Sequence, residues 1–503
     1  MATIQKKIAD SLQVLKNYQD AHGDNLVIRG ANTLGRTHTQ RLLKSGYLQM
    51  VVKGWYIPSS PGSEGDSTVW YVSYWSFVTA YLNTKYGEAW CLSPELSLDF
   101  HSGKSVIPQQ LIVRSSLGAN NILQLPFGTS LVVIKAALPT GIMVEPRYSL
   151  RIYPMEQALL MVGPNYYRTS ALEARTCLAS LKDVSYLASL AIDAGLTTRS
   201  GRVAGALRSI GRAEMADELL HTMRRVGYTL VEANPFDEDS TLTTFAESPS
   251  ALRIRLLWTR MRHVVLDKMR IEASPRDVAS VLAMMDATYV KDSYNSLSIE
   301  GYKITEALLE RVRAGRWNPE HDDEDTERRN TLAARGYYQA YELLKKGVSA
   351  CFAGQSAAQL YAKEHHEWHF QLFEPCVRAG IVKASELIGY RRSQVYIRNS
   401  MHTPMNSSEV LDAMGALSDL MANEANALVR AILGHFFFVD IHPYMDGNGR
   451  TARFVMNSQL VTAGFPWVVV PVARRNEYIT ALECASVKED IEPFVEFISS
   501  LMR

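Results

Sequence analysis

The chain has 503 residues and is almost neutral, with 53 Lys and Arg against 52 Asp and Glu. Hydrophobic residues make up 47% and charged residues 21% of the sequence. This is the composition of a globular protein with apolar cores, and it excludes wholesale disorder and a collagen-like fibre. At roughly 150 residues per domain, the length predicts about three domains.

Cysteine usage and hydropathy together predict a cytoplasmic protein with no membrane partner. The five cysteines are scattered without CxxC spacing, which argues against a disulfide framework or a structural zinc site. The first residues lack the apolar core of a signal peptide. No apolar run reaches the length of about 20 residues that a membrane-spanning helix needs.

Residues 1–60 form a basic block, with eight Lys and Arg against three Asp. The pattern predicts a first helix over 3–18, a turn and a second helix within 33–47, and a small two-stranded wing over 48–57. The side chains suited to phosphates and base edges lie on or near the second helix: they are Arg36, Thr37, His38, Gln40 and Arg41. Double-stranded DNA is therefore a candidate partner, and a block used only for protein contacts is the alternative.

The middle of the chain, 67–235, is predicted to be a mixed α/β domain. It follows a linker rich in Pro, Gly and Ser at 58–66 and ends near a cluster of acidic and turn residues at 233–240. Two β-rich runs, 110–113 and 130–134, precede a segment with helical periodicity at 181–232. The aromatic run WYVSYW at 70–75 is expected in the core.

The remaining residues, 250–503, are predicted to form a helical domain. Amphipathic patterns run through 304–312 and 410–433, and alternation at 394–398 suggests a short strand. The segment HHEWH at 365–369 resembles a metal site, but it is not HExxH and no distant ligand set accompanies it. We therefore interpret these histidines as packed or solvated side chains.

The segment IHPYMDGNGRTAR at 441–453 carries the clearest chemical signal. An apolar helix is predicted to end at His442, followed by a turn of residues that tolerate unusual backbone angles and a new helix near Arg450. The N–H groups of such a turn form a nest for anions. Arg450 and Arg453 lie three residues apart and share a helix face, so a ligand with several phosphates is expected.

Two further side chains of this segment suit catalysis. His442 titrates near neutral pH and is the natural general base. Asp446 is placed to hold Mg²⁺, which prefers carboxylate and phosphate oxygens. The alternative is a plain connection between two helices with a solvated arginine pair.

This segment resembles the Fic signature HPFx[D/E]GNGRxxR, with Tyr444 in place of Phe, and the resemblance covers about the last 250 residues. It implies an all-helical core and Mg²⁺-dependent transfer of AMP from ATP to a Tyr, Thr or Ser hydroxyl of a target protein. His442 would deprotonate the hydroxyl, and Asp446 would bind Mg²⁺. The phosphates would be held by Gly447, Asn448, Gly449, Arg450 and Arg453.

A second segment, SLSIEG at 296–301, resembles the inhibitory pattern [S/T]xxxE[G/N] of this family. Ser296 and Glu300 would share a face of a helix near 290–301, and Gly301 completes the pattern; an ordinary helix end is the alternative. The resemblance implies that Glu300 pairs with Arg453 and takes the partner of the γ-phosphate, because a carboxylate competes directly with phosphate for arginine. The enzyme would then restrain itself.

A third segment, 389–404, is similar in position to the β-hairpin flap of Fic proteins. The flap would align a target segment by strand addition, and its candidate residues are Val395, Tyr396 and Ile397. An ordinary hairpin packed on helices is the alternative.

The basic block resembles the winged helix-turn-helix of AbiEi-type antitoxins, and the middle block loosely resembles their C-terminal part. The expected protein is therefore multidomain and mainly α. It would combine a winged helix-turn-helix at 1–60, a mixed α/β domain at 67–235 and a Fic domain with a β-hairpin flap at 250–503.

The expected function is that of a protein adenylyltransferase restrained by Glu300. The alternative is a DNA-binding transcriptional regulator or antitoxin-like protein whose Fic domain senses nucleotide. The sequence leaves open the target, the nucleotide beyond the ATP default, removal of AMP and homo-oligomer formation.

Overall fold

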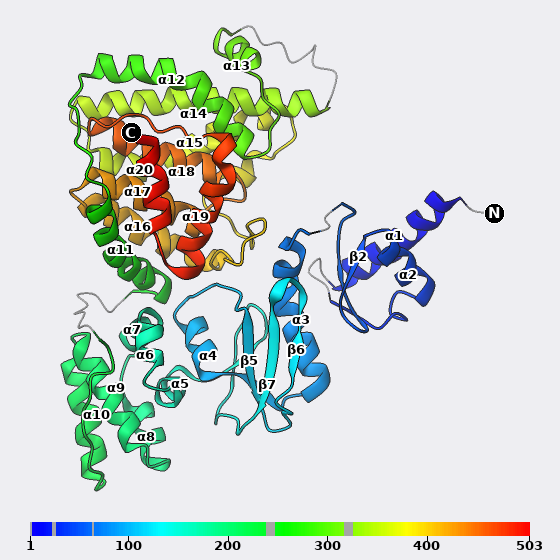
Figure 1. The fold of residues 1–503 in the computed structure, drawn as a ribbon, viewed down its shortest axis with the longest axis vertical. Coiled ribbons are helices and arrows are strands. Elements are labelled where there is room, and N and C mark those ends of the chain that lie inside the picture. Colours follow the sequence, from blue (N-terminus) through cyan, green and yellow to red (C-terminus); the bar gives the residue numbers. More distant parts are fainter. Residues whose placement is uncertain (1–2, 23–26, 63–64, 238–246, 316–324, 503) are drawn as a thin grey trace. The chain divides into compact units, whose positions relative to one another are not determined.

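The computed structural model describes residues 3–22, 27–62, 65–237, 247–315 and 325–502, with side chains from 328 onward in the last range. The chain divides into two compact units. The first comprises 1–249 together with 396–403, and the second comprises 250–395 and 404–503. The described residues are mostly helical, and their strands all fall between 28 and 152 (Figure 1).

The N-terminal block contains two helices and a small antiparallel sheet. Helix α1 (Ile4–His22) and helix α2 (Arg36–Lys44) accompany strands β1 (Ile28–Arg29), β2 (Leu48–Val52) and β3 (Trp55–Pro58), in the order β1-β3-β2. Gly54 turns between β2 and β3 with a φ of 82°, which glycine adopts without a steric penalty. The predicted helices and wing strands are present, whereas the winged-helix assignment stays a prediction.

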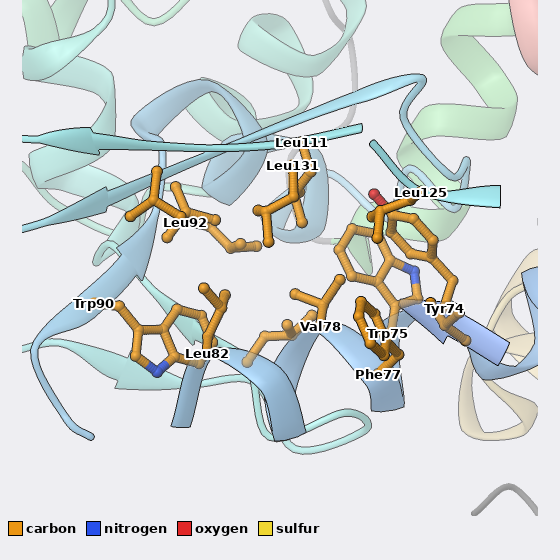
Figure 2. Packing of buried hydrophobic residues seen from close by; sticks show 14 of the residues in the cluster. Tyr74, Trp75, Phe77, Val78, Leu82, Trp90, Leu92, Leu111, Leu125 and Leu131 are labelled. Carbon is orange, nitrogen blue, oxygen red and sulfur yellow. The ribbon is translucent and has the colours of Figure 1, made fainter. Parts of the chain in front are cut away.

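A mixed sheet forms the core of the first unit beside helix α3 (Thr68–Tyr86). Its order is β4-β5-β7-β6, from β4 (Trp90–Leu92), β5 (Gln110–Ser115), β7 (Ser130–Lys135) and β6 (Ile122–Gln124). Strands β5 and β7 run parallel, and both outer pairs are antiparallel. The aromatic run of α3 packs against these strands, as expected: Trp70 and Tyr74 are fully buried. Figure 2 shows Tyr74 among the buried residues of this cluster.

Short elements complete this unit. Helix α4 (Pro94–His101) is capped by Ser93, whose hydroxyl accepts from Leu96 N, and β8 (Met143–Val144) pairs with β9 (Arg151–Ile152). The helices that follow are α5 (Met155–Met161), α6 (Tyr166–Thr169), α7 (Ala171–Ser180), α8 (Ser185–Asp193), α9 (Thr197–Ser209) and α10 (Ala213–Arg225). The predicted break at 233–240 lies partly outside the described residues.

The second unit is a helical bundle, drawn in green to red in Figure 1. It contains α11 (Pro249–Lys268), α12 (Val278–Ile299), α13 (Glu306–Arg313), α14 (Asp325–Phe352), α15 (Ala357–Arg378), α16 (Val410–Asn423), α17 (Ala427–Ile441), α18 (Asn448–Thr462), α19 (Arg475–Lys488) and α20 (Glu492–Met502). Helix α18 lies at its centre, with thirteen of its fifteen residues buried.

The pattern at 410–433 is interrupted in the structure. Helix α16 ends at Asn423 and α17 begins at Ala427, because the Asn426 side chain caps the new helix by accepting from Leu428 N and Val429 N. None of the helices in the described part of the chain combines the length and apolar composition that a bilayer crossing needs. The domain boundaries proposed from the sequence stay predictions.

Candidate active site

His442 sits at the C-terminal end of α17 in a left-handed conformation, with a φ of 54°. Its Nδ1 lies 3.1 Å from the carbonyl oxygen of Val439. A carbonyl can only accept a hydrogen bond, so the neutral imidazole carries its proton on Nδ1 and its basic lone pair on Nε2. That tautomer is the one a general base at this position needs.

The turn after His442 is braced by Asn448, the first residue of α18. The Asn448 Oδ1 accepts from Tyr444 N, and its Nδ2 donates to Tyr444 O, both at 2.9 Å. Arg391 Nε also donates to the carbonyl of His442 at 2.8 Å. The expected role of Asn448 at the phosphates stays a prediction, since here its amide group holds the turn. Arg391 was not identified from the sequence.

Two glycines of the turn are in close contact with other elements. Gly447 has a φ of 82°, and an added Cβ would lie 2.8 Å from the ring of Phe373. At Gly449 an added Cβ would lie 2.6 Å from Oε1 of Glu300. The Glu300 carboxylate therefore lies directly against the backbone that was expected to receive phosphate.

Arg450 is buried with part of its hydrogen-bonding capacity unused. Its side chain is 1% exposed, and its Nη2 lies 3.4 Å from Oδ1 of Asp446. Nε and Nη1 have no hydrogen-bond partner among the described residues. The guanidinium lies against Phe373 and Tyr302, with its carbon 4.9 and 5.4 Å from the ring centroids. A buried cation with unpaired donors is the arrangement that an anionic ligand satisfies.

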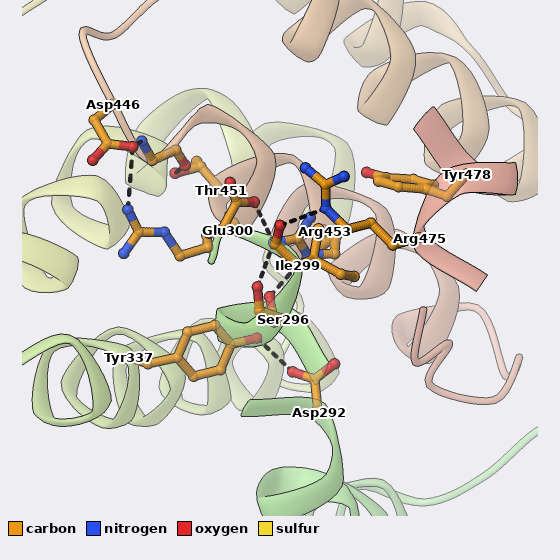
Figure 3. Close-up of polar contacts among 12 residues, drawn as sticks. Asp292, Ser296, Ile299, Glu300, Tyr337, Asp446, Thr451, Arg453, Arg475 and Tyr478 are labelled. Atoms are coloured by element: carbon orange, nitrogen blue, oxygen red, sulfur yellow. Dashed lines mark hydrogen bonds and ion pairs between the residues drawn. The ribbon is translucent and has the colours of Figure 1, made fainter. Parts of the chain in front are cut away.

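Arg453 is held by the helix that carries the inhibitory pattern, as Figure 3 shows. Its Nη2 lies 2.8 Å from Oε1 of Glu300, and its Nε donates to Oγ of Ser296 at 2.8 Å. The Arg453 side chain is 3% exposed and that of Glu300 is 29% exposed. Gly301 follows with a φ of 89° at the end of α12. The structure thus brings Ser296, Glu300 and Arg453 together, as the resemblance implied.

Further contacts, which sequence reasoning missed, anchor the end of α12. Arg475 Nε donates to the carbonyl of Ile299 at 2.8 Å (Figure 3), and Val472 N donates to Oδ1 of Asn295 at 2.8 Å. One turn earlier, Asp292 accepts from the Tyr337 hydroxyl. No local signal in the sequence connects these residues, because each partner lies on another helix or connection.

Asp446 offers one exposed carboxylate to a metal. Its side chain is 64% exposed, and its Oδ1 already accepts from Gly447 N at 2.6 Å. In the described part of the chain no group of three or more His, Cys, Asp and Glu is arranged to hold a metal. Mg²⁺ commonly takes one or two carboxylates and completes its shell with phosphate oxygens and water. The donor set therefore fits a Mg²⁺ shared with a nucleotide, and it does not form a cage of protein ligands.

The predicted strand at 394–398 was wrong, because these residues form no strand. The backbone bonds lie farther along the chain, within the first unit. Ile107 N donates to Met401 O at 3.0 Å and Thr403 N to Ser105 O at 2.7 Å, with one isolated bridge between Val106 and His402. Val395 is buried, whereas Tyr396 and Ile397 are intermediate in exposure. Their role in target docking stays a prediction.

The five candidate DNA-binding residues do not share one exposed face. Arg36, Thr37 and Gln40 are exposed on α2. His38 and Arg41 instead contact α1: His38 Nδ1 lies 3.0 Å from Ser11 Oγ, and Arg41 Nη1 donates to the same oxygen at 2.7 Å. Only Arg36, Thr37 and Gln40 therefore remain as an exposed set.

Comparison with known proteins finds a family match over part of this site. Residues 360–460, from α15 into α18, match the sequence model of the Fic/DOC family. This region is a Fic domain. The protein adenylyltransferase Fic of Drosophila willistoni is 28% identical over 251 residues, which cover 46% of each chain. The protein adenylyltransferase fic-1 of Caenorhabditis briggsae is 30% identical over 228 residues, covering 43% of this chain and 40% of that relative.

The similarity is confined to part of each protein. The chain spans less than half of the length of these curated relatives. A solved structure of a Fic-1 fragment from C. elegans aligns with 69% of this chain and 88% of its own, at 20% identity and a TM-score of 0.36. The assignment of the Fic domain depends on the sequence matches.

Proposed function

We propose that the Fic domain transfers AMP from ATP to a hydroxyl side chain of a target protein, with Mg²⁺ bound at Asp446. The buried guanidinium of Arg450 carries this proposal: two of its nitrogens are unpaired beside a glycine turn at the start of a helix. Phosphates satisfy such donors and are favoured at a helix N-terminus. The names of the relatives, which are protein adenylyltransferases, support the same reaction.

The transfer would depend on positioning and charge. His442 Nε2 takes the proton of the target hydroxyl, and the hydroxyl oxygen forms a bond to the α-phosphorus. The bond from that phosphorus to the bridging oxygen breaks, and pyrophosphate leaves. Arg450 and Arg453 hold the phosphates, and the Mg²⁺ supplies neutralisation of their charge when bound. Reactions of this class gain most of their acceleration from such electrostatic positioning.

We further propose that Glu300 restrains this reaction. Its carboxylate pairs with Arg453 and lies against Gly449, so a phosphate that approaches both groups must displace it. Charge-assisted pairs of Arg with carboxylate and with phosphate are of similar strength. The Glu300 carboxylate is partly exposed, so a ligand with more negative charge can reach it and compete with it for Arg453.

The experiment compares wild type, Glu300→Gly and Glu300→Gly/His442→Ala. Each protein is incubated with α-labelled ATP and Mg²⁺, with and without cell lysate. Label on protein with Glu300→Gly alone would support both the transfer through His442 and the restraint by Glu300. If all three stay unlabelled although ATP binding is measurable, the AMP-transfer proposal fails. Equal labelling of wild type and Glu300→Gly would contradict the proposed restraint by Glu300 but not the proposed AMP transfer.

A second candidate is a DNA-binding regulator, supported by the exposed side chains of Arg36, Thr37 and Gln40 on α2. Binding through phosphates would weaken steeply with salt. Gel-shift titrations at low and high salt, with Arg36→Ala as the variant, test this function. No shift of any duplex at low salt would exclude it.

A further inference from the structure

Three histidines of α15 have no part in the proposed transfer. His365 and His369 lie one turn apart and are 2% and 3% exposed, and His366 lies beside them. Burial lowers the pKa of all three, that of His369 to about 4. They are therefore neutral near pH 7 and available as hydrogen-bond donors and acceptors.

All three histidines contact Tyr444 in the turn of the catalytic motif. The Tyr444 hydroxyl lies 2.8 Å from Nδ1 of His365 and 2.8 Å from Nδ1 of His366. Its ring stacks on His369, with centroids 3.7 Å apart and planes 10° apart. His369 Nε2 also lies 3.0 Å from the carbonyl oxygen of Asp446. Helix α15 therefore holds the turn at a side chain and at the backbone.

The hydrogen positions in this group are mutually dependent. A hydroxyl donates one hydrogen bond, so one of the two Nδ1 atoms accepts from Tyr444 and the other donates to it. The Tyr390 hydroxyl extends the chain, 3.4 Å from Nε2 of His365. The chain from Tyr390 through His365 and Tyr444 to His366 allows the protons to run in either direction. The Tyr444 side chain is 2% exposed, so water has little access to replace these partners.

The position of Tyr444 is transmitted to the groups that would act on the nucleotide. Its backbone N–H and carbonyl are both bonded to Asn448. His442 lies two residues before it and Asp446 two residues after it. Because the Tyr444 ring is held at its hydroxyl and across its face, this short turn has little freedom to move. A misplacement of reacting groups by about 1 Å can strongly reduce the rate.

We propose that the Tyr444 hydroxyl, held between His365 and His366, is a positioning group that locks the turn 442–448 against α15. It does not touch the reacting atoms. It sets the place of His442 relative to the phosphate nest. The Fic signature that this chain resembles has Phe at this position, which would leave the two histidine nitrogens without this partner. The proposal rests on the proposed transfer reaction only for its kinetic test.

The test compares Tyr444→Phe with the matched variant Tyr361→Phe, both in the Glu300→Gly background. Tyr361 lies on α15, the helix that carries the three histidines, and its ring stacks on that of His365 with centroids 5.1 Å apart. Its hydroxyl lies outside the hydrogen-bond chain of Tyr444. We expect Tyr444→Phe to speed amide hydrogen exchange of 442–449 about fivefold and to lower kcat about tenfold, because the turn loses its anchor. The KM for ATP should change less than about twofold, since the phosphate donors stay in place. Tyr361→Phe should change none of these.

Two outcomes would overturn the proposal. One is unchanged exchange of 442–449 in Tyr444→Phe, and the other is an equal rise of exchange throughout the Fic domain, which would indicate general destabilisation. Hydrogen exchange reports on the turn even if no AMP transfer is found, so failure of the proposed function remains distinguishable from failure of this inference.

A double-mutant cycle tests the link to the histidines. If the hydroxyl acts through His365, Tyr444→Phe combined with His365→Leu should expose the turn no further than the stronger single variant does. Fully additive effects on exchange of 442–449 would mean that the two side chains act separately, and would contradict the proposal.

Discussion

Replacing Asp292 by Asn should remove a pH-dependent contribution to the stability of the second unit. Asp292 lies on α12 and is 3% exposed. Its Oδ2 accepts from the Tyr337 hydroxyl at 2.6 Å and its Oδ1 from Nε1 of Trp467 at 3.0 Å. Burial raises the pKa of this carboxyl from 3.8 to about 6, although both hydrogen bonds and the charge of Arg453 oppose the rise.

The size of the effect follows from that pKa. The folded protein holds the Asp292 proton more tightly than the unfolded chain does. The group therefore contributes its full stabilisation below pH about 4 and loses it as the pH rises through about 6. At about 1.4 kcal/mol per pKa unit, a rise from 3.8 to about 6 corresponds to about 3 kcal/mol. Asn is neutral throughout and can keep both bonds, accepting from Trp467 and donating to Tyr337.

The measurement is urea unfolding of wild type and Asp292→Asn between pH 4 and pH 7. Relative to wild type, the variant should gain about 2 kcal/mol in free energy of unfolding from pH 4 to pH 7, because part of the full effect lies below pH 4. Other titrating groups cancel in the difference. Asp277 is a matched control, because it caps the start of the same helix and its hydrogen bonds to Ser280 lower its pKa. The difference for Asp277→Asn should stay nearly constant from pH 4 to pH 7, because a lowered pKa moves the titration of this carboxyl below that range. A difference for Asp292→Asn that does not vary with pH would refute the reasoning.

Three other predictions concern contacts within one unit or the other. Glu300→Gln should weaken the contact with Arg453 and lower the free energy of unfolding, measured in urea, by about 1–2 kcal/mol. ATP binding, measured by calorimetric titration, should tighten by less than about twofold while kcat rises more; a change of about tenfold in ATP affinity would contradict it. Gly449→Ala places a Cβ 2.6 Å from the Glu300 carboxylate, so it should cost about 1–3 kcal/mol alone and much less with Glu300→Gly in a double-mutant cycle. Asn399 has a φ of 57°, and its Oδ1 accepts from Ser67 N. Asn399→Gly keeps that conformation but removes the acceptor, and it should speed limited proteolysis of 396–403; unchanged cleavage would show that this bond does not hold the segment.

The turn between α17 and α18 could be predicted from the sequence because its signals are local. The residues from His442 to Arg453 span twelve positions. As expected, one helix ends at His442 and another follows the glycine turn. The start of α18 was expected near Arg450 and lies at Asn448. Here the Gly447 backbone, with its positive φ, begins the helix two residues earlier.

Contacts between distant segments could not be predicted in the same way. The resemblance to a known family, and not periodicity, connected Glu300 to Arg453 across 153 residues. No pattern connects Tyr444 with His365, because each fits an ordinary buried helix or turn when considered alone. The strand expected at 394–398 failed for a related reason. Alternation of side chains cannot say which backbone groups will pair, and the pairing lies at 401–403.

The two arginines of the motif differ in a way that bears on how restraint would act. Arg453 is occupied by Glu300 and Ser296, whereas Arg450 retains unpaired nitrogens. If Glu300 occupied both, nucleotide could not bind at all. With Arg450 still available, we expect wild type to bind ATP. The α-phosphate would then lie out of position for attack by the hydroxyl that His442 deprotonates. Restraint would then lower kcat more than it weakens nucleotide binding, because an interaction made only in the productive arrangement affects the rate and leaves ground-state binding largely unchanged.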